Sequence, residues 1–139
     1  MNHHLNGKPL TIFSDGNQQR AFSFVYDIVE PLWVAGCAPE ASGEIINLGG
    51  KTTISIDQAA DLLIDVMGCG SKVYKESRHE VQNAWSSWEK SKQILGYEER
   101  HTLEEGLRIM WGWAQLQPRR AQQAWESYEL DRGLYSFWK

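Results

Sequence analysis

The chain has 139 residues, which can bury one small core but cannot hold a dinucleotide-binding domain together with a substrate domain. With 42% hydrophobic and 23% charged residues, it is expected to be globular rather than disordered. The net charge of −4 argues against nucleic acid or an anionic membrane as a partner, although a local basic site can still bind phosphate.

The sequence carries no clear targeting or metal-binding signal. No apolar run approaches the roughly 20 residues that span a bilayer, and Met1–Lys8 lacks the apolar segment of a signal peptide. Cys37 and Cys69 do not have the spacing of metal ligands, so two reduced thiols are expected, with a disulfide as the alternative. His3 and His4 have no third ligand nearby, so no metal is expected. These features predict a cytoplasmic protein without a membrane segment.

The first half of the chain predicts short strands around one helix. Strands are expected at Leu10–Phe13, at the alternating aromatic residues within 22–26, and at Glu44–Leu48. Asp27 with Glu30 three residues later forms a capping-box pattern, so a helix is expected to begin there and to end near Gly36. Pro31 then falls in the first turn, where proline is tolerated.

The second half predicts three helices, each begun by a polar residue. Ser55 with Gln58 and Thr102 with Glu105 repeat the capping-box pattern, and a shorter helix is expected to begin at Ser87. The expected helix ends are marked by Gly68, Gly96 and Pro118. A brief strand is expected between the first and second of these helices, at Lys72–Lys75.

The order of these elements predicts a small α+β domain of short strands and three or four helices. We expect a single domain over residues 1–139, in which residues 119–139 form a C-terminal tail that packs on the rest. This tail is polar up to Trp125 and ends in a run of aromatic and apolar residues, Leu134–Trp138.

Four segments, taken in their order and spacing, carry a resemblance to a known family: Pro9–Arg20, Asn47–Gly50, Arg78–Tyr97 and Thr102–Leu107. They resemble the carboxyl-terminal, substrate-binding lobe of the extended short-chain dehydrogenase/reductase family. Its members are NAD-dependent nucleotide-sugar epimerases, dehydratases and decarboxylases. The resemblance runs from about Gly7 to Lys139. It implies the fold of that lobe, and it implies that the cofactor-binding half is absent.

The resemblance further implies that two arginines bind the diphosphate of a uridine diphosphate sugar. Arg20 takes the place of the arginine that follows the family's Asp-Gly turn. Arg78, with Glu80 two residues later, takes the place of the second arginine. A guanidinium stays charged and pairs bidentately with phosphate oxygens, which fits this role. Asp27 is expected to support the site as a helix cap, and Asn47 as a turn and hydrogen-bonding residue.

No catalytic residue is expected in this chain. The family's Tyr-x-x-x-Lys pair has one formal match, Tyr135 with Lys139, which we reject because it lies at the chain end without a cofactor fold beside it. Asn47–Lys51 is too short for a dinucleotide loop, and no Gly-rich loop follows an expected strand. No cofactor is therefore expected here, and NAD is implied only for the intact family enzyme.

Three hypotheses about function remain open. The chain is a truncated nucleotide-sugar-binding lobe that is not catalytic alone, a self-associating interaction or structural protein derived from that lobe, or one half of a split epimerase completed by a separate dinucleotide-binding subunit. A homo-oligomer is expected, because surface that faces the cofactor domain needs a cover and the seven Trp residues favour interfaces. Binding of a uridine diphosphate sugar separates the first hypothesis from the second.

Overall fold

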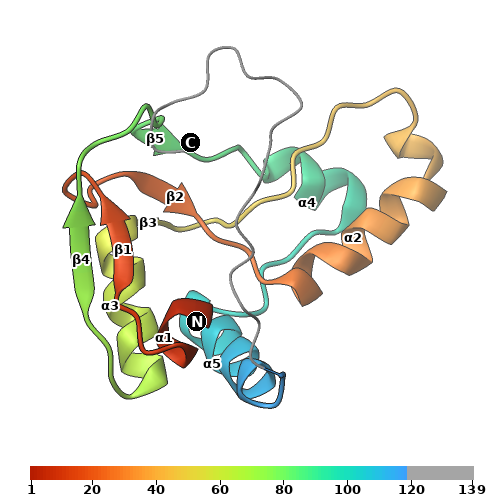
Figure 1. Cartoon of the computed structure of the whole chain (residues 1–139). Coiled ribbons are helices and arrows are strands. Elements are labelled where there is room, and N and C mark those ends of the chain that lie inside the picture. Colours follow the sequence, from red (N-terminus) through yellow and green to blue (C-terminus); the bar gives the residue numbers. More distant parts are fainter. Residues whose placement is uncertain (119–139) are drawn as a thin grey trace, which may run out of the picture.

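Residues 1–118 are the part of the chain that the structure, a computed structural model, describes, and they form two small sheets flanked by helices (Figure 1). The helices are α1 (Asn2–Leu5), α2 (Val25–Cys37), α3 (Ile56–Met67), α4 (Glu89–Leu95) and α5 (Leu103–Gln115), with a 3-10 turn η1 (Pro39–Ala41) after α2. The strands are β1 (Leu10–Phe13), β2 (Gln19–Ala21), β3 (Thr53–Ser55), β4 (Lys72–Lys75) and β5 (Asn83–Ala84). The predicted α+β class is confirmed.

β2 is the central strand of the larger sheet. It pairs antiparallel with β3, where Arg20 lies opposite Ile54, and parallel with β5, where Arg20 lies opposite Ala84. In the smaller sheet β1 and β4 run parallel, with Leu10 opposite Lys72. Parallel pairing needs a long crossover, and β2, α2, β3 and α3 provide it between β1 and β4. The larger sheet therefore brings residue 20 beside the segment that enters β5.

α3 and α5 pack against each other, and both begin with the predicted capping box. The Ser55 hydroxyl accepts a hydrogen bond from the Gln58 N–H, while the Gln58 side chain accepts one from the Ser55 N–H. Thr102 and Glu105 form the same reciprocal pair. α3 ends at Gly68, whose φ of 80° suits glycine. The buried apolar residues are Ile12, Ala60, Val66, Met67, Leu95, Tyr97, Leu107 and Ala114.

The N-cap of α2 lies three residues earlier than predicted, at Phe24 instead of Asp27, and this changes the role of Asp27. Phe24 is the N-cap of α2 and makes no side-chain capping bond. Asp27 consequently lies inside the first turn, with its side chain buried. Pro31, expected in the first turn, lies within the helix instead. The capping prediction for Asp27 is wrong, because its carboxylate accepts its hydrogen bonds from a distant part of the chain.

Three further local predictions are wrong. The second strand is Gln19–Ala21 and not the aromatic residues of 22–26, because residues 19–21 pair with two strands while Phe24 caps α2. Glu44–Leu48 is not a strand, and no backbone hydrogen bond joins residues 45–48 to another backbone group within residues 1–118. The N-cap of α4 is Trp88 rather than Ser87, although Gly96 ends the helix as predicted.

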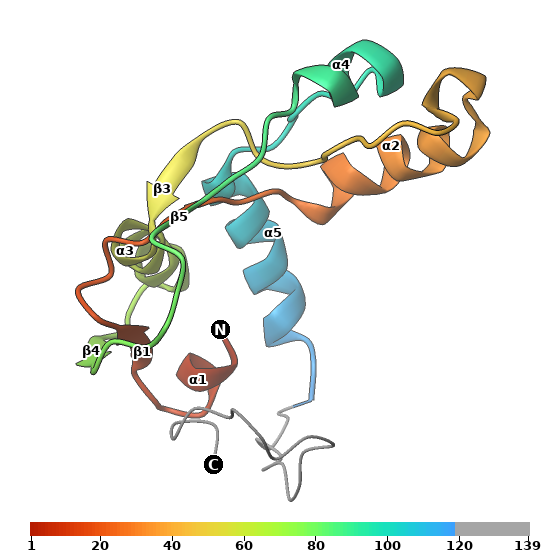
Figure 2. The ribbon, with the colours of Figure 1, turned by 90° about the horizontal axis from the view of Figure 1, so that it is seen from above.

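α2 and α4 project together away from the rest of the fold, whereas α3 stays with β1 and α5 (Figure 2). None of the helices within residues 1–118 combines the length and the apolar composition that a membrane span needs. The expected packing of the tail 119–139, and the formal match of Tyr135 with Lys139, lie outside the described residues.

Candidate functional site

Arg20, the first predicted diphosphate ligand, lies in the middle of β2 and is half-buried. Its Nη1 donates to the carbonyl of Gln19 at 2.7 Å and to the carbonyl of Gln82 at 3.4 Å. Gln82 directly precedes β5. The guanidinium therefore joins β2 to the segment 76–82, which also carries the second predicted ligand.

Arg78 lies in this segment between β4 and β5. Its Nε and Nη2 donate to Oε1 of Glu80, and both side chains are partly buried. The guanidinium carbon lies 3.9 Å from the ring centroid of Phe13, the last residue of β1. A guanidinium stacked on an aromatic face keeps its plane while its edges stay available for hydrogen bonding. Phe13 thus lies against the Arg78 guanidinium, while Glu80 accepts from its edge.

The two arginine-bearing segments meet beside the β2–β5 pair, and the described link between them runs through Gln82. Each guanidinium is engaged by protein acceptors, backbone carbonyls for Arg20 and the Glu80 carboxylate for Arg78. A diphosphate carries more negative charge than any of these acceptors, so it can compete with them for the donors. The joint role of the two arginines stays a prediction.

Asp27 ties α2 to the start of α5. Its side chain is 1% exposed, and Oδ2 accepts from the backbone N–H of Arg100 at 3.2 Å and of His101 at 3.0 Å. Oδ1 lies 2.7 Å from His101 Nδ1. Burial by itself raises the pKa of Asp27, but hydrogen bonds from the His101 ring and from the two backbone groups outweigh it and hold that pKa below its usual value. Asp27 therefore supports the fold at residues 100–102.

Asn47 is exposed in the segment that leads from η1 to β3. Two residues later, the carbonyl of Gly49 accepts a hydrogen bond of 3.0 Å from the hydroxyl of Tyr97, which is 1% exposed. Burial, reinforced by the carboxylates of Glu99 and Asp27, raises the pKa of Tyr97. Tyr97 is therefore a neutral donor that anchors the segment after Asn47, and the structure forms no turn at residues 44–50, where Asn47 was expected to be a turn residue. The hydrogen-bonding role of Asn47 stays a prediction.

A charged cluster that the sequence did not predict joins α3 to β4. Lys72 Nζ lies 2.8 Å from carboxylate oxygens of both Asp57 and Asp61, and the Tyr74 hydroxyl donates to Asp57 at 2.5 Å. The hydrogen bond with Asp57 is the main reason that the pKa of Lys72 is raised, and the same bond lowers the pKa of Asp57. The i, i+4 spacing of the two aspartates indicates a shared helix face, but only the fold brings Lys72 to it.

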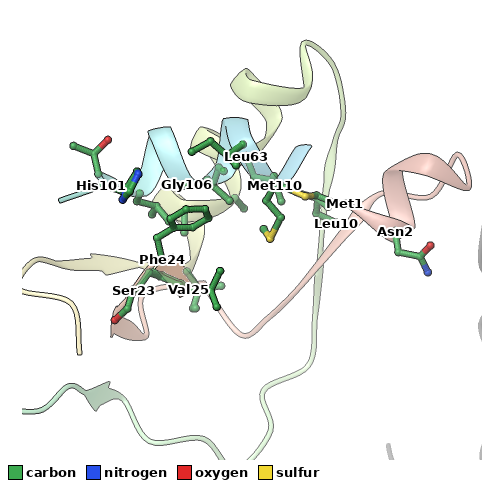
Figure 3. Close-up of a pocket in the computed structure, with 18 of the residues that line it drawn as sticks. Met1, Asn2, Leu10, Ser23, Phe24, Val25, Leu63, His101, Gly106 and Met110 are labelled. Carbon is green, nitrogen blue, oxygen red and sulfur yellow. The ribbon is translucent and has the colours of Figure 1, made fainter. Parts of the chain in front are cut away.

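An apolar cavity of about 970 Å³ lies between β1, α3, α5 and the stretch 22–26 (Figure 3). Phe24 extends into it beneath Gly106, and a Cβ added to Gly106 would lie 2.9 Å from the Phe24 ring. Neither Arg20 nor Arg78 lines this cavity, so it is distinct from the predicted diphosphate site. Within residues 1–118, no three His, Cys, Asp or Glu side chains cluster closely enough to hold a metal ion.

Comparisons with known proteins show which proteins this chain is similar to. Residues 1–49 match the NAD dependent epimerase/dehydratase family. YtcB of Bacillus subtilis, named as an uncharacterized UDP-glucose epimerase, is 34% identical over 106 residues, which cover 75% of this chain and 34% of YtcB. The UDP-glucuronate 4-epimerase of Thermodesulfobacterium geofontis is 36% identical over 110 residues, which cover 77% of this chain and 33% of that enzyme. The chain thus spans about a third of the length of these relatives.

Solved structures show the same likeness. The UDP-glucuronic acid 4-epimerase of Bacillus cereus, in complex with UDP-glucuronic acid and NAD, matches with a TM-score of 0.74 and 30% identity over 82% of this chain and 37% of that enzyme. The UDP-glucose 4-epimerase of Thermotoga maritima, solved with UDP-glucose, matches with a TM-score of 0.74 and 28% identity over 84% of this chain and 38% of its own. Over about four fifths of its length, the chain is therefore similar to nucleotide-sugar epimerases in sequence and in fold.

Proposed function

We propose that this chain is the nucleotide-sugar-binding lobe of an NAD-dependent epimerase/dehydratase-like protein, shortened relative to the enzymes it resembles and not catalytic alone. The observation that carries the proposal is the meeting of the Arg20 and Arg78 segments beside the β2–β5 pair. Two permanent positive charges on adjoining segments suit a dianionic diphosphate. The relatives are named for uridine diphosphate sugars, which indicates uridine as the nucleotide.

Binding requires the two guanidinium groups to change acceptors. Arg20 exchanges the carbonyl of Gln82 for a phosphate oxygen, and Arg78 exchanges the Glu80 carboxylate for another. The stacking of Arg78 on Phe13 can persist during this exchange, because it uses the face of the guanidinium and not its edge.

The proposal that the chain is not catalytic alone is supported by its sequence. No Gly-rich dinucleotide-binding loop follows an expected strand in it. NAD belongs to the intact enzymes in this proposal and not to this chain. Detectable NAD binding by calorimetry, or turnover of a uridine diphosphate hexose by the purified chain, contradicts this part.

A titration with uridine diphosphate, followed by backbone NMR shifts, tests the binding part. A dissociation constant in the millimolar range, about −4 kcal/mol, is expected, because one lobe alone encloses the ligand only partly. Binding should weaken as salt is added. Arg78→Ala should abolish it, and Arg78→Lys should restore only a part, because the planar fork is missing. Arg108→Ala is the matched control, since Arg108 is exposed and pairs with Glu104 on α5.

Two other functions stay open, and each rests on a specific observation. Exposed apolar side chains on α2 favour a self-associating interaction protein, which predicts a homo-oligomer that does not bind the nucleotide. This chain covers only about a third of the length of its relatives. That share favours the hypothesis that it is one half of a split epimerase, completed by a separate dinucleotide-binding subunit. Shifts that map away from both arginines, or that persist in the Arg78→Ala variant, favour the interaction protein.

A further inference from the structure

The apolar cavity between β1, α3, α5 and the stretch 22–26 is only partly closed by the described residues. Large apolar side chains on its walls are exposed to solvent, with exposed fractions of 56% for Val25, 66% for Tyr26 and 57% for Trp113. On a soluble protein, exposed apolar side chains that gather around one hollow mark an interaction site. An apolar occupant is therefore expected to cover this cavity.

Water is a poor occupant for the cavity. A volume of about 970 Å³ holds about 30 water molecules, and a buried water typically makes about three hydrogen bonds to polar groups. Two of the polar side chains on the wall, His101 and Thr102, already pair with Asp27 and Glu105. The helix side chains around them are mostly apolar and include Ala59, Ala60, Leu63, Leu107 and Met110. Apolar side chains therefore suit this space better than water.

The end of the chain contains an apolar segment of suitable composition. The run Leu134–Trp138 has one leucine and three aromatic residues among its five positions. Each aromatic side chain buries 150–250 Å², so the three rings together can remove roughly 500 Å² of apolar surface from water. The 15 residues before this run, 119–133, are rich in charged and amide side chains and end in Gly133. This sequence has the pattern of a polar connection followed by an apolar anchor.

The connection is long enough to bring the anchor to the cavity. Trp113 lies near the end of α5, which closes at Gln115, and Trp113 itself lines the cavity. A flexible connection of 15 residues has a root-mean-square span of roughly 20 Å, which matches the length of about 20 Å expected for the 13 residues of α5. Tethered segments of this kind have effective concentrations in the millimolar range. Even weak contacts then suffice for docking within one chain.

We propose that the run Leu134–Trp138 docks in this cavity and covers the exposed apolar side of α5. The walls include Met1 and Met110 (Figure 3). Methionine side chains are flexible and polarizable, so they suit contact with aromatic rings. Neither Arg20 nor Arg78 lines the cavity, so the docking does not depend on nucleotide binding.

The methionine methyl groups test the proposal in the full chain. Met110 lines the cavity, whereas Met67 is buried in α3 and does not line it. With carbon-13 methyl labels, nuclear Overhauser effects are expected from the rings of Phe137 and Trp138 to the Met110 methyl group, and none to Met67. The double variant Phe137→Ser, Trp138→Ser should shift the Met110 signal and leave the Met67 signal in place. It should also bind the apolar dye ANS severalfold more strongly than the wild type. Trp125→Ser, in the polar connection, is the matched control and should change neither readout.

Two outcomes overturn the proposal directly. One is the absence of Overhauser effects between the two rings and Met110 in the wild-type chain, which holds even if the double variant fails to fold. The other is equal ANS binding by the wild type and a folded double variant. Overhauser effects that arise only between labelled and unlabelled copies in a mixed sample assign the cavity to the chain end of a second copy instead. The Arg78→Ala variant, which should lose uridine diphosphate binding, should keep the Overhauser effects to Met110, so the failure of one proposal can be told from the failure of the other.

Discussion

Replacing Asp27 by Ala tests the account of this residue as a structural tie between α2 and α5. The substitution leaves the N–H groups of Arg100 and His101 without their acceptor and removes the partner of the His101 ring. A hydrogen bond to a charged group contributes about 1.5–3 kcal/mol, and the three bonds share one carboxylate, so a loss of about 3 kcal/mol is expected. Urea denaturation at pH 7 measures it, with a midpoint about 1.5 M lower.

Glu104→Ala is the matched control for this experiment. It removes an exposed i, i+4 pair with Arg108, for which a cost of about 0.5 kcal/mol is expected. The reasoning is refuted if Asp27→Ala costs less than about 1 kcal/mol, or no more than the control, because a buried acceptor of three donors cannot be that dispensable.

The same carboxylate gives a pH dependence with a defined sign. The pKa of Asp27 lies below its usual value, so the charged form stabilises the folded state. This stabilisation is fully present above the pKa of the unfolded chain, about 3.9, and is lost as pH falls through the lower folded pKa. The difference in unfolding free energy between the wild type and Asp27→Ala should therefore be constant from pH 7 to about 5 and shrink below pH 4. A difference that grows on acidification contradicts the assignment.

Two further substitutions have distinct expected outcomes. Gly50→Ala places a Cβ against the backbone carbonyl of Phe22, so the free energy of unfolding should fall by about 3 kcal/mol in urea denaturation. Gly36→Ala in α2 is the control, because its added Cβ meets no atom. It should leave the free energy of unfolding unchanged or raise it by up to about 1 kcal/mol. Glu80→Gln removes the carboxylate that accepts hydrogen bonds from the Arg78 guanidinium, so uridine diphosphate should bind about fivefold more tightly in an NMR titration. Weaker binding by this variant means that Glu80 orients the arginine instead.

The sequence was sufficient where the signal is local. Ser55 and Thr102 are recognisable as caps because their partners lie three residues away, and the structure confirms both reciprocal pairs. β1 and β4 were likewise predicted with their observed bounds, because each is a run of β-forming residues next to turn residues. The α+β class follows from the order of such elements, and it is confirmed.

Local patterns failed where partners lie far apart in the chain. Asp27 resembles a cap with Glu30, but its partners lie 73 and 74 residues away, at Arg100 and His101. Residues 44–48 have the composition of a strand, yet no strand pairs with them within residues 1–118, so pattern alone overpredicts structure there.

The candidate site also combines residues that the sequence indicates with contacts that only the fold creates. Arg20 and Arg78 were found through a family resemblance, and their placement on adjoining segments depends on the β2–β5 pairing. β5 has two residues, too few for a periodic signal in the sequence. The stacking on Phe13 and the tie through Gln82 depend on the same tertiary arrangement, so spacing alone does not indicate them.

The side-chain signals of the two arginines test the central proposal most directly. Nitrogen-15 spectra of the guanidinium Nε groups are recorded while uridine diphosphate is added to the wild-type chain. If Arg20 and Arg78 hold one diphosphate, both signals move together and fit a single dissociation constant in the millimolar range, about 1 mM. If neither signal moves at several times that concentration, or if only one of them does, the two arginines do not form a shared diphosphate site.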